Sequence, residues 1–210
     1  MIILSHRGYW QKNIQKNNIS SLIRSFNYNF GVELDIRDYN SNLVISHDLP
    51  SSKNPPLKLF LEKINKKNKN LFLAINIKSD GLQKKLKELL QKYKICNYFV
   101  FDMSIPDCIQ YIREDINYFV RQSEYEKDLI FYNKAKGVWL DQFNKNWINE
   151  KIILYHHNNK KMICIVSPEL HSRKYKNEWS KYKKIEKKFP NLQLMLCTDL
   201  PITAESFFND

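Results

Sequence analysis

Residues 31–48 read GVELDIRDYNSNLVISHD and hold two apolar runs with a polar turn between them. Apart from two acids, the first run, Gly31–Ile36, consists of glycine and of β-branched or aliphatic residues, which is typical of a strand covered on both faces. Two acids, Glu33 and Asp35, interrupt it two positions apart, so both project from the same face of the strand. The second run, Leu43–His47, is predicted to return beside the first as a hairpin arm. This stretch therefore predicts a buried strand that carries charge on one face.

Further short apolar runs follow along the whole chain, and helical stretches separate them. The eight predicted strands are Ile2–Ser5, Gly31–Ile36, Leu71–Ile77, Tyr98–Phe101, Tyr118–Val120, Gly137–Leu140, Met162–Val166 and Gln193–Cys197. The helices predicted between them are Ser20–Asn29, Leu57–Lys67, Leu82–Tyr93, Pro106–Glu114, Tyr125–Tyr132, Trp147–Asn158 and Glu178–Phe189. Ser20 and Ser104 are predicted as N-caps of the helices near them. Strands that alternate with helices are typical of βα units around a parallel sheet.

Eight such units predict the α/β class and, within it, a compact (β/α)8 TIM barrel made of a single domain, residues 1–210. Because 210 residues fall short of the roughly 250 typical of this fold, we expect short loops and a trimmed eighth helix within Pro201–Asp210. The hairpin arm Leu43–His47 is expected at the mouth of the barrel, outside its strands. An open doubly wound sheet is the alternative, but no GxGxxG motif follows a strand and the chain has only four glycines.

The composition sets further limits on the class of protein. With 43% hydrophobic and 13% aromatic residues, the chain can bury a substantial core, which excludes wholesale disorder. No apolar run approaches the roughly 20 residues of a membrane-spanning helix, and the opening MIILSHRG lacks the charged region of a signal peptide. We therefore expect a cytoplasmic protein with no transmembrane segment. The widely spaced cysteines do not indicate a disulfide frame or a zinc site and are predicted to be buried reduced thiols: Cys96, Cys108, Cys164 and Cys197.

A formal net charge of +12 raises the question of a nucleic-acid partner. The excess comes from 28 lysines against only 6 arginines, and lysine lacks the planar fork that contacts phosphates and bases at two points. Many of the lysines alternate with apolar residues at helical spacing, which favours solvated helix faces over a binding patch. The sequence therefore predicts no nucleic-acid partner, and binding driven by charge is the weakest of the alternatives.

Polar residues gather at the carboxyl ends of the predicted strands, where the loops of an α/β barrel form one face. His6 and Arg7 end the first strand, His47 ends the hairpin arm, and Lys78 follows the third strand. Each of these residues alone has a structural alternative as an ordinary surface or core side chain. The two acids of the second strand are more informative, because two like charges buried together cost several kcal/mol without a nearby cation. A divalent metal ion would relieve that cost, so the pair indicates a functional site.

Taken together, these segments resemble the glycerophosphodiester phosphodiesterases and, more broadly, the barrel phosphodiesterases related to phosphatidylinositol phospholipases C. The resemblance rests on segments that follow one another as in that family: Ser-His-Arg-Gly at 5–8, Asn18–Ser20, Gly-Val-Glu-Leu-Asp at 31–35, Val-Ile-Ser-His-Asp at 44–48, Ile-Asn-Ile-Lys at 75–78 and Cys-Thr-Asp-Leu-Pro at 197–201. Each segment alone is a weak signal, whereas the ordered set spans nearly the whole chain and is fairly specific for the superfamily.

The resemblance implies a role for each residue that matches these motifs. His6 and His47 would be the general acid and base, Arg7 would bind the phosphate, and Lys78 would stabilise its oxygens. The implied ligands of a divalent cation, Mg²⁺ or Ca²⁺, are Glu33, Asp35 and Asn76. Physical chemistry agrees with these roles, because imidazole exchanges protons near neutral pH and guanidinium donates two parallel hydrogen bonds to a phosphate. Oxygen ligands also suit both cations.

The sequence departs from the family at two points. Asn76 stands where the family usually has a third metal-binding glutamate, which predicts weaker metal binding or a compensating acid such as Asp141 or Glu169. The segment after the hairpin arm is short and lacks the inserted region that covers the substrate in many members, which predicts a more open site. At later strand ends, Arg121 and Trp139 are predicted to bind a hydroxyl-rich ligand such as a sugar phosphate, with roles in loops and helix caps as the alternative.

The sequence thus predicts metal-assisted hydrolysis of a small alcohol- or sugar-phosphodiester. The alternative is a degenerate barrel that binds a phosphorylated ligand without catalysis, which the missing acid at Asn76 motivates. The sequence leaves open the substrate alcohol, the metal, the oligomeric state, and whether hydrolysis is direct or passes through a cyclic phosphate.

Overall fold

The computed structural model describes residues 1–65 and 71–209 of the chain. The chain divides into two compact units, one made of Met1–Leu4 with Phe119–Asp210 and the other of Ser5–Tyr118. Strand β1, Ile2–His6, begins in the first of these units and ends in the second. That residues 1–210 act as a single domain stays a prediction.

The unit Ser5–Tyr118 is built on three parallel strands and a hairpin arm. Strand β2, Gly31–Tyr39, pairs with β4, Leu73–Ile77, and β4 pairs with β5, Tyr98–Phe101. Strand β3, Asn42–Ile45, runs antiparallel to the end of β2, which confirms the predicted hairpin arm. Every residue of β4 is buried, as expected of a strand with both faces covered.

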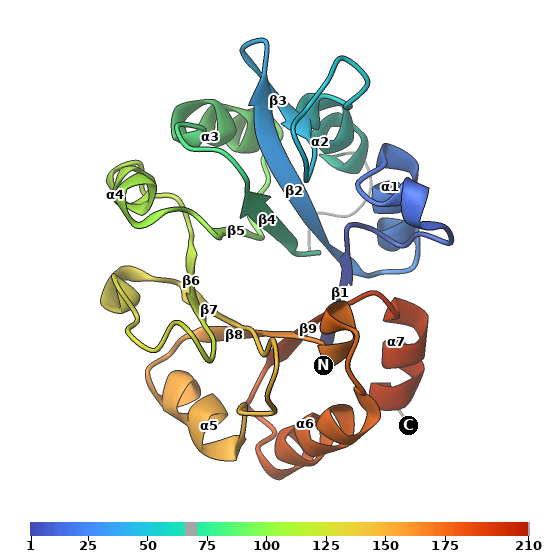
Figure 1. Cartoon of the computed structure of the whole chain (residues 1–210), viewed down its shortest axis with the longest axis vertical. Helices are drawn as coiled ribbons and strands as arrows, with labels where there is room; N and C mark the ends of the chain where they lie inside the picture. The colour runs from blue at the N-terminus through green and yellow to red at the C-terminus, as the bar shows by residue number, and fades with distance from the viewer. Residues whose placement is uncertain (66–70, 210) are drawn as a thin grey trace. The chain divides into compact units, whose positions relative to one another are not determined.

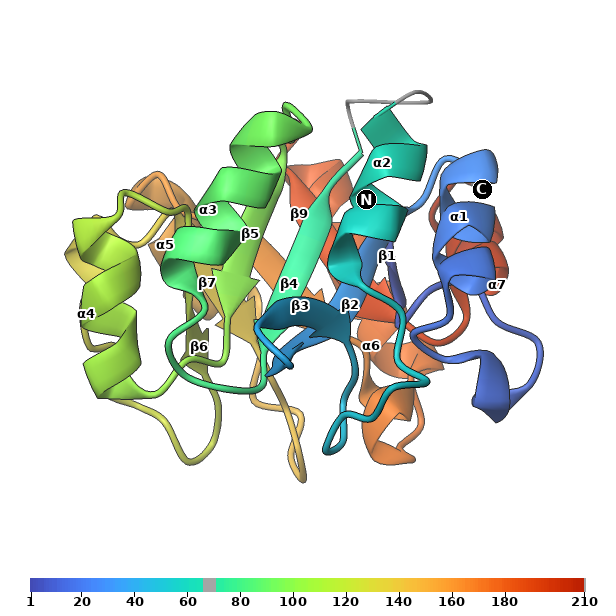
Figure 2. The same cartoon turned by 90° about the horizontal axis from the view of Figure 1, so that it is seen from above.

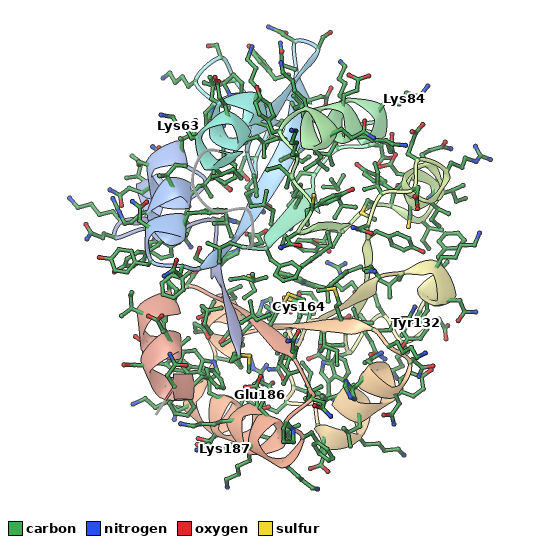
Figure 3. The ribbon with its side chains drawn as sticks, turned by 180° about the vertical axis from the view of Figure 1, so that it is seen from behind. Lys63, Lys84, Tyr132, Cys164, Glu186 and Lys187 are labelled. Atoms are coloured by element: carbon green, nitrogen blue, oxygen red, sulfur yellow. The ribbon has the colours of Figure 1, made fainter. Side chains whose placement is uncertain are left out.

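Helices accompany these strands: α1, Ile19–Asn27; α2, Leu57–Asn65; α3, Gln83–Lys92; and α4, Ile105–Arg113. Helices α2 and α3 lie along the same side of β2 and β4 (Figures 1 and 2). Leu86 and Leu90 of α3 are buried, whereas Lys84 of α3 and Lys63 of α2 point away from the strands (Figure 3). The lysines therefore occupy solvated helix faces, as predicted. The end of the predicted helix Leu57–Lys67 lies outside the described residues.

Side chains determine where two of these helices begin. Ser104 caps α4 as predicted, because its hydroxyl accepts a hydrogen bond from the backbone N of Asp107 at 3.3 Å. The cap predicted at Ser20 is wrong. Helix α1 is capped by Asn18, which has the extended backbone of a cap and accepts a hydrogen bond from the N of Ser20 at 3.1 Å, whereas Ser20 is already helical.

The other unit carries parallel strands that pair in chain order: β6, Phe119–Gln122; β7, Gly137–Leu140; β8, Met162–Val166; and β9, Leu194–Thr198. Its helices are α5, Glu150–Asn158; α6, Lys176–Lys188; and α7, Pro201–Asn209. Helix α7 has only nine residues, in keeping with the short final helix that the sequence predicts.

The helix predicted over Tyr125–Tyr132 is wrong. Between β6 and β7 the chain forms a loop that ends in a 3₁₀ turn, Tyr132–Lys134. The hydroxyl of Ser123 accepts hydrogen bonds from the backbone N of Tyr125 and of Glu126 at 3.2 and 3.1 Å, and such local bonds compete with a helix. Phe131 then adopts a left-handed φ of 61°, through which a right-handed helix does not continue.

In the described part of the chain, eight strands outside the hairpin arm alternate with helices, except between β6 and β7, where only a 3₁₀ turn stands. This order confirms the predicted α/β class and (β/α)8 barrel fold. None of the helices in the described part of the chain is long and apolar enough to cross a membrane. Cys108, Cys164 and Cys197 are buried as predicted. The prediction for Cys96 is wrong, because this residue lies in the exposed connection between α3 and β5.

Candidate active site

Polar residues of the unit Ser5–Tyr118 share one face of β2 and β4. In the register of this parallel pair, Glu33 lies opposite Ala74 and Asp35 lies opposite Asn76. Registered residues on neighbouring strands project to the same face, so both carboxylates and the Asn76 amide lie on one side of the sheet. All three polar side chains belong to buried residues, with exposed fractions of 1%, 0% and 7%.

The turn after β1 brings Arg7 to these acids. Arg7 Nε lies 2.9 Å from Asp35 Oδ2, and the backbone N of Arg7 donates a hydrogen bond to Glu33 Oε2 at 3.1 Å. Arg7 has a left-handed φ of 56°, and Gly8 follows with a φ of 89°. A side chain at Gly8 would meet the backbone of α1 at 2.8 Å, so this turn requires glycine. The local backbone is therefore shaped to hold the guanidinium against β2.

His6 approaches Glu33 from the end of β1. His6 Nε2 lies 3.9 Å from Glu33 Oε2, and the indole of Trp10 donates a hydrogen bond to the backbone O of His6 at 3.1 Å. Burial and the neighbouring charge of Asp35 raise the pKa of Glu33 well above its ordinary value, although the charge and backbone N–H of Arg7 act in the opposite direction. A further cation on this face would favour the ionised form of Glu33.

Lys78 supplies a second cation to Asp35. Lys78 Nζ lies 3.7 Å from Asp35 Oδ1 and 3.6 Å from Asp102 Oδ2, at the end of β5. Asp35 has no exposed surface, so its charge is balanced inside the protein by Arg7 and Lys78. The structure thus joins residues on or just after β1, β2, β4 and β5 into one charged cluster.

Asn17 also belongs to this cluster, which its position in the sequence did not indicate. Its Nδ2 donates a hydrogen bond to Asp35 Oδ2 at 2.8 Å, and its Oδ1 accepts one from the N of Asp35 at 3.2 Å. The backbone N of Asn17 also donates to the O of Arg7 at 2.9 Å. Its left-handed φ of 58° is one that asparagine tolerates. The only signal in the sequence was an asparagine just before a helix, which is typical of ordinary loops.

His47 follows β3 and is paired with Asp48. His47 Nδ1 lies 2.8 Å from Asp48 Oδ1, and this hydrogen bond lowers the pKa of Asp48 below its ordinary value. Arg37 Nε donates a hydrogen bond to the O of His47 at 3.0 Å and so holds this part of the loop. His47 and Arg7 line the same hollow, and Arg7 also contacts Asp35.

Two buried oxygens of the cluster, Asp35 Oδ1 and Asn76 Oδ1, have no hydrogen-bond donor within the described residues. Both are hard ligands of the kind that Mg²⁺ and Ca²⁺ prefer, and Glu33 on the same face adds a third. The donor set therefore fits a divalent cation. The set has only two carboxylates and one amide. In residues 1–65 and 71–209, no group of three or more His, Cys, Asp or Glu side chains could hold a metal ion.

Arg121 and Trp139 lie in the other unit, on β6 and β7. Arg121 Nε forms an ion pair with Glu126 Oε2 at 2.6 Å. Trp139 is only 4% exposed. Their roles in binding a hydroxyl-rich ligand stay predictions.

The two acids predicted to compensate for Asn76 also lie in this second unit. Asp141 Oδ1 is 2.6 Å from His171 Nε2. Glu169 accepts hydrogen bonds from the hydroxyls of Ser167 and Thr198, and burial raises its pKa above the ordinary value. Both acids are thus engaged within their own unit, and a role for either as a metal ligand stays a prediction.

The sequence matches no protein-family model and no curated protein. The structure, in contrast, is similar to solved structures at low sequence identity. A candidate glycerophosphodiester phosphodiesterase from Galdieria sulphuraria has a TM-score of 0.77 at 15% identity, over 100% of this chain and 98% of that one.

Two further solved structures agree with this one. The glycerophosphodiester phosphodiesterase of Thermotoga maritima has a TM-score of 0.68 at 13% identity, over 98% of both chains. An Oleispira antarctica phosphodiesterase in complex with the product sn-glycerol-3-phosphate has a TM-score of 0.69 at 14% identity, over 100% of this chain and 97% of that one. The resemblance expected from the motifs is confirmed at the level of the fold: along its whole length, this chain is similar in structure to glycerophosphodiester phosphodiesterases.

Proposed function

We propose that this chain hydrolyses a small alcohol- or sugar-phosphodiester at the cluster around Asp35. One observation carries the proposal: side chains from separate segments converge on one buried side of one unit and combine acids, cations and an amide there. These residues are Arg7, Glu33, Asp35, Asn76 and Lys78. Full-length similarity in fold to glycerophosphodiester phosphodiesterases supports this reaction class. The phosphate product bound to the Oleispira antarctica enzyme supports a small phosphate ester as ligand.

Each protein group has a defined task in this proposal. Arg7 and Lys78 bind the phosphoryl oxygens, because guanidinium and ammonium groups stabilise the negative charge that develops there. Asp48 accepts the Nδ1–H of His47, which leaves Nε2 as the base. This base takes a proton from the attacking water, or from a neighbouring hydroxyl of the substrate, in which case water then opens the cyclic phosphate. His6 Nε2 gives a proton to the leaving oxygen.

Glu33, Asp35 and Asn76 would hold a divalent cation, Mg²⁺ or Ca²⁺, which supplies positive charge next to the phosphoryl oxygens when it is bound. The two buried oxygens without donors, Asp35 Oδ1 and Asn76 Oδ1, support this assignment. Asn17 keeps Asp35 oriented through its two hydrogen bonds.

The test uses the purified full chain and bis(p-nitrophenyl) phosphate, with Mg²⁺, Ca²⁺ or a chelator present. His6→Gln and His47→Gln are each expected to lower kcat by about a hundredfold or more, the usual contribution of a general acid or base. His157→Gln makes the same chemical change in the other unit and is expected to retain activity. Activity that survives both active-site substitutions would refute the assigned roles.

A protein that binds a phosphorylated ligand without turnover is the second candidate. The pairing of Asp35 with both Arg7 and Lys78 favours it, because the cluster is then charge-balanced without a metal ion. Calorimetric titration separates the two functions: phosphate binding without any heat from millimolar Mg²⁺ or Ca²⁺, and without hydrolysis, would identify the binder.

A further inference from the structure

A hollow of about 500 Å³ adjoins the proposed active site within the unit Ser5–Tyr118. It lies between the 3₁₀ turn Asn13–Gln15 after β1, the start of α1, and the loop that follows β3. Its volume is in the range of roughly 300–1,000 Å³ that small-molecule sites occupy. None of the proposed catalytic roles uses most of its lining, so the hollow has room for a part of the substrate beyond the reacting phosphate.

The hollow has a strongly positive lining. Three cations line it, Arg7, Lys16 and Lys53, and Asp48 is its one acid among the described residues. Asp48 already accepts a hydrogen bond from His47, which partly offsets its negative charge. Arg7 is likewise paired with Asp35, so the positive charge that an anion would meet in the hollow comes chiefly from Lys16 and Lys53.

The two lysines differ in how they are held. Lys16 Nζ lies 4.3 Å from the centre of the Trp10 ring, and this cation–π contact limits the freedom of the side chain. Lys53 sits on the short loop after β3 and forms no ion pair within the described residues. A bound anion would therefore be attracted by Lys16, which is partly ordered, and by Lys53, which is not engaged in an ion pair among the residues described.

The hollow and the catalytic cluster meet at Arg7 and His47. Arg7 contacts Asp35 inside the cluster and also lines the hollow, and His47 lines the hollow as well. A phosphodiester bound by the guanidinium and the imidazole would therefore extend one of its two substituents into the hollow. That substituent would lie next to Lys16 and Lys53.

We infer that the hollow is a second anion subsite, so that the preferred substrate is a phosphodiester whose alcohol carries another negatively charged group, such as a phosphate monoester. This inference rests on the proposed function, because it places the reacting phosphate at Arg7 and His47. The subsite recognises the second anion by charge, through Lys16 and Lys53. The same chemistry occurs in a free phosphorylated polyol and in an anionic lipid headgroup.

The test measures binding, so that it does not depend on turnover. Calorimetry compares inositol 1,4-bisphosphate with inositol 1-phosphate on the full chain at low salt. The wild-type chain is expected to bind the bisphosphate about tenfold more tightly, since two partly exposed charge pairs contribute about threefold each. This preference should shrink as salt rises, because exposed charges are screened.

Lys16→Gln and Lys53→Gln are each expected to lower the affinity ratio about threefold, and the double variant should bring it close to one. Lys84→Gln is the matched control, because Lys84 points away from the strands on α3 and lies outside the hollow. Circular dichroism of each variant verifies that the fold is retained.

Three results would overturn the subsite: an affinity ratio near one in the wild-type chain, a ratio that the double variant leaves unchanged, or no binding of either probe at millimolar concentration. Flotation with phosphatidylcholine vesicles, with and without phosphatidylinositol 4-phosphate, tests the lipid source: lysine-dependent binding to the charged vesicles alone assigns the anion to a headgroup. If the affinity ratio holds but no phosphodiester is hydrolysed, the proposed function fails while the anion subsite stands. If the chain hydrolyses a phosphodiester but binds both inositol phosphates with equal affinity, the anion subsite fails while the proposed function stands.

Discussion

A buried histidine outside the candidate active site predicts a loss of stability in mild acid. His156 of α5 has no exposed surface. Its Nε2 lies 2.8 Å from Gln122 Oε1 and its Nδ1 lies 2.9 Å from the hydroxyl of Tyr132. Because an amide oxygen can only accept, Nε2–H donates to Gln122 and Nδ1 accepts the hydroxyl hydrogen of Tyr132. The structure thus holds the neutral ring, with one donor and one acceptor satisfied.

Burial lowers the pKa of His156 from 6.5 to about 4. A folded-state pKa below the unfolded value means that protons bind the unfolded chain more tightly. The stabilisation is therefore complete above pH 6.5 and is lost as the pH falls toward 4, by about 3 kcal/mol in total and about 2 kcal/mol by pH 5.

The assay is urea unfolding at pH 7 and pH 5, followed by tryptophan fluorescence, because Trp139 and Trp179 are buried in the same unit as His156. His156→Gln is expected to be less stable at pH 7 and to lose about 2 kcal/mol less than the wild-type chain between the two pH values. His157→Gln changes the neighbouring histidine in the same way and should keep the wild-type pH dependence. If His156→Gln and the wild-type chain lose the same free energy of unfolding, the reasoning is refuted.

Three further predictions concern the active-site unit. Gly8→Ala should lower the free energy of unfolding by about 2 kcal/mol or more, because the new Cβ would lie 2.8 Å from backbone atoms at a φ of 89°. Gly81→Ala is the control: a Cβ there would meet nothing within 4 Å, so its Tm in thermal unfolding should fall by less. Equal shifts in Tm would contradict the steric reason. Asn17→Ala should lower kcat about tenfold with little change in KM, since Asp35 loses its amide partner; an unchanged kcat would argue against this positioning role. Asn76→Glu should tighten Mg²⁺ or Ca²⁺ binding in calorimetry, because it adds a third carboxylate beside two buried ones. An unchanged affinity would show that the cation does not bind at residue 76.

The amino-acid pattern alone was enough to predict the alternation of strands and helices and the hairpin arm Leu43–His47. The pattern also predicted that Glu33 and Asp35 share one face, because side chains two positions apart in a strand point to the same side. These features depend on local periodicity and on burial, which each segment expresses by itself. The motif order was enough to indicate the fold class, which the full-length structural similarity confirms.

Tertiary structure decided what the periodicity could not express. Asn17 and Arg7 became partners of Asp35 because three separate segments pack together at that point. The predicted helix over Tyr125–Tyr132 failed because hydrogen bonds to the Ser123 hydroxyl closed a tight turn there instead. A sequence pattern reports which residues share a face, whereas the partner that a buried charge finds depends on contacts between residues far apart in the chain, which form only when the chain has folded.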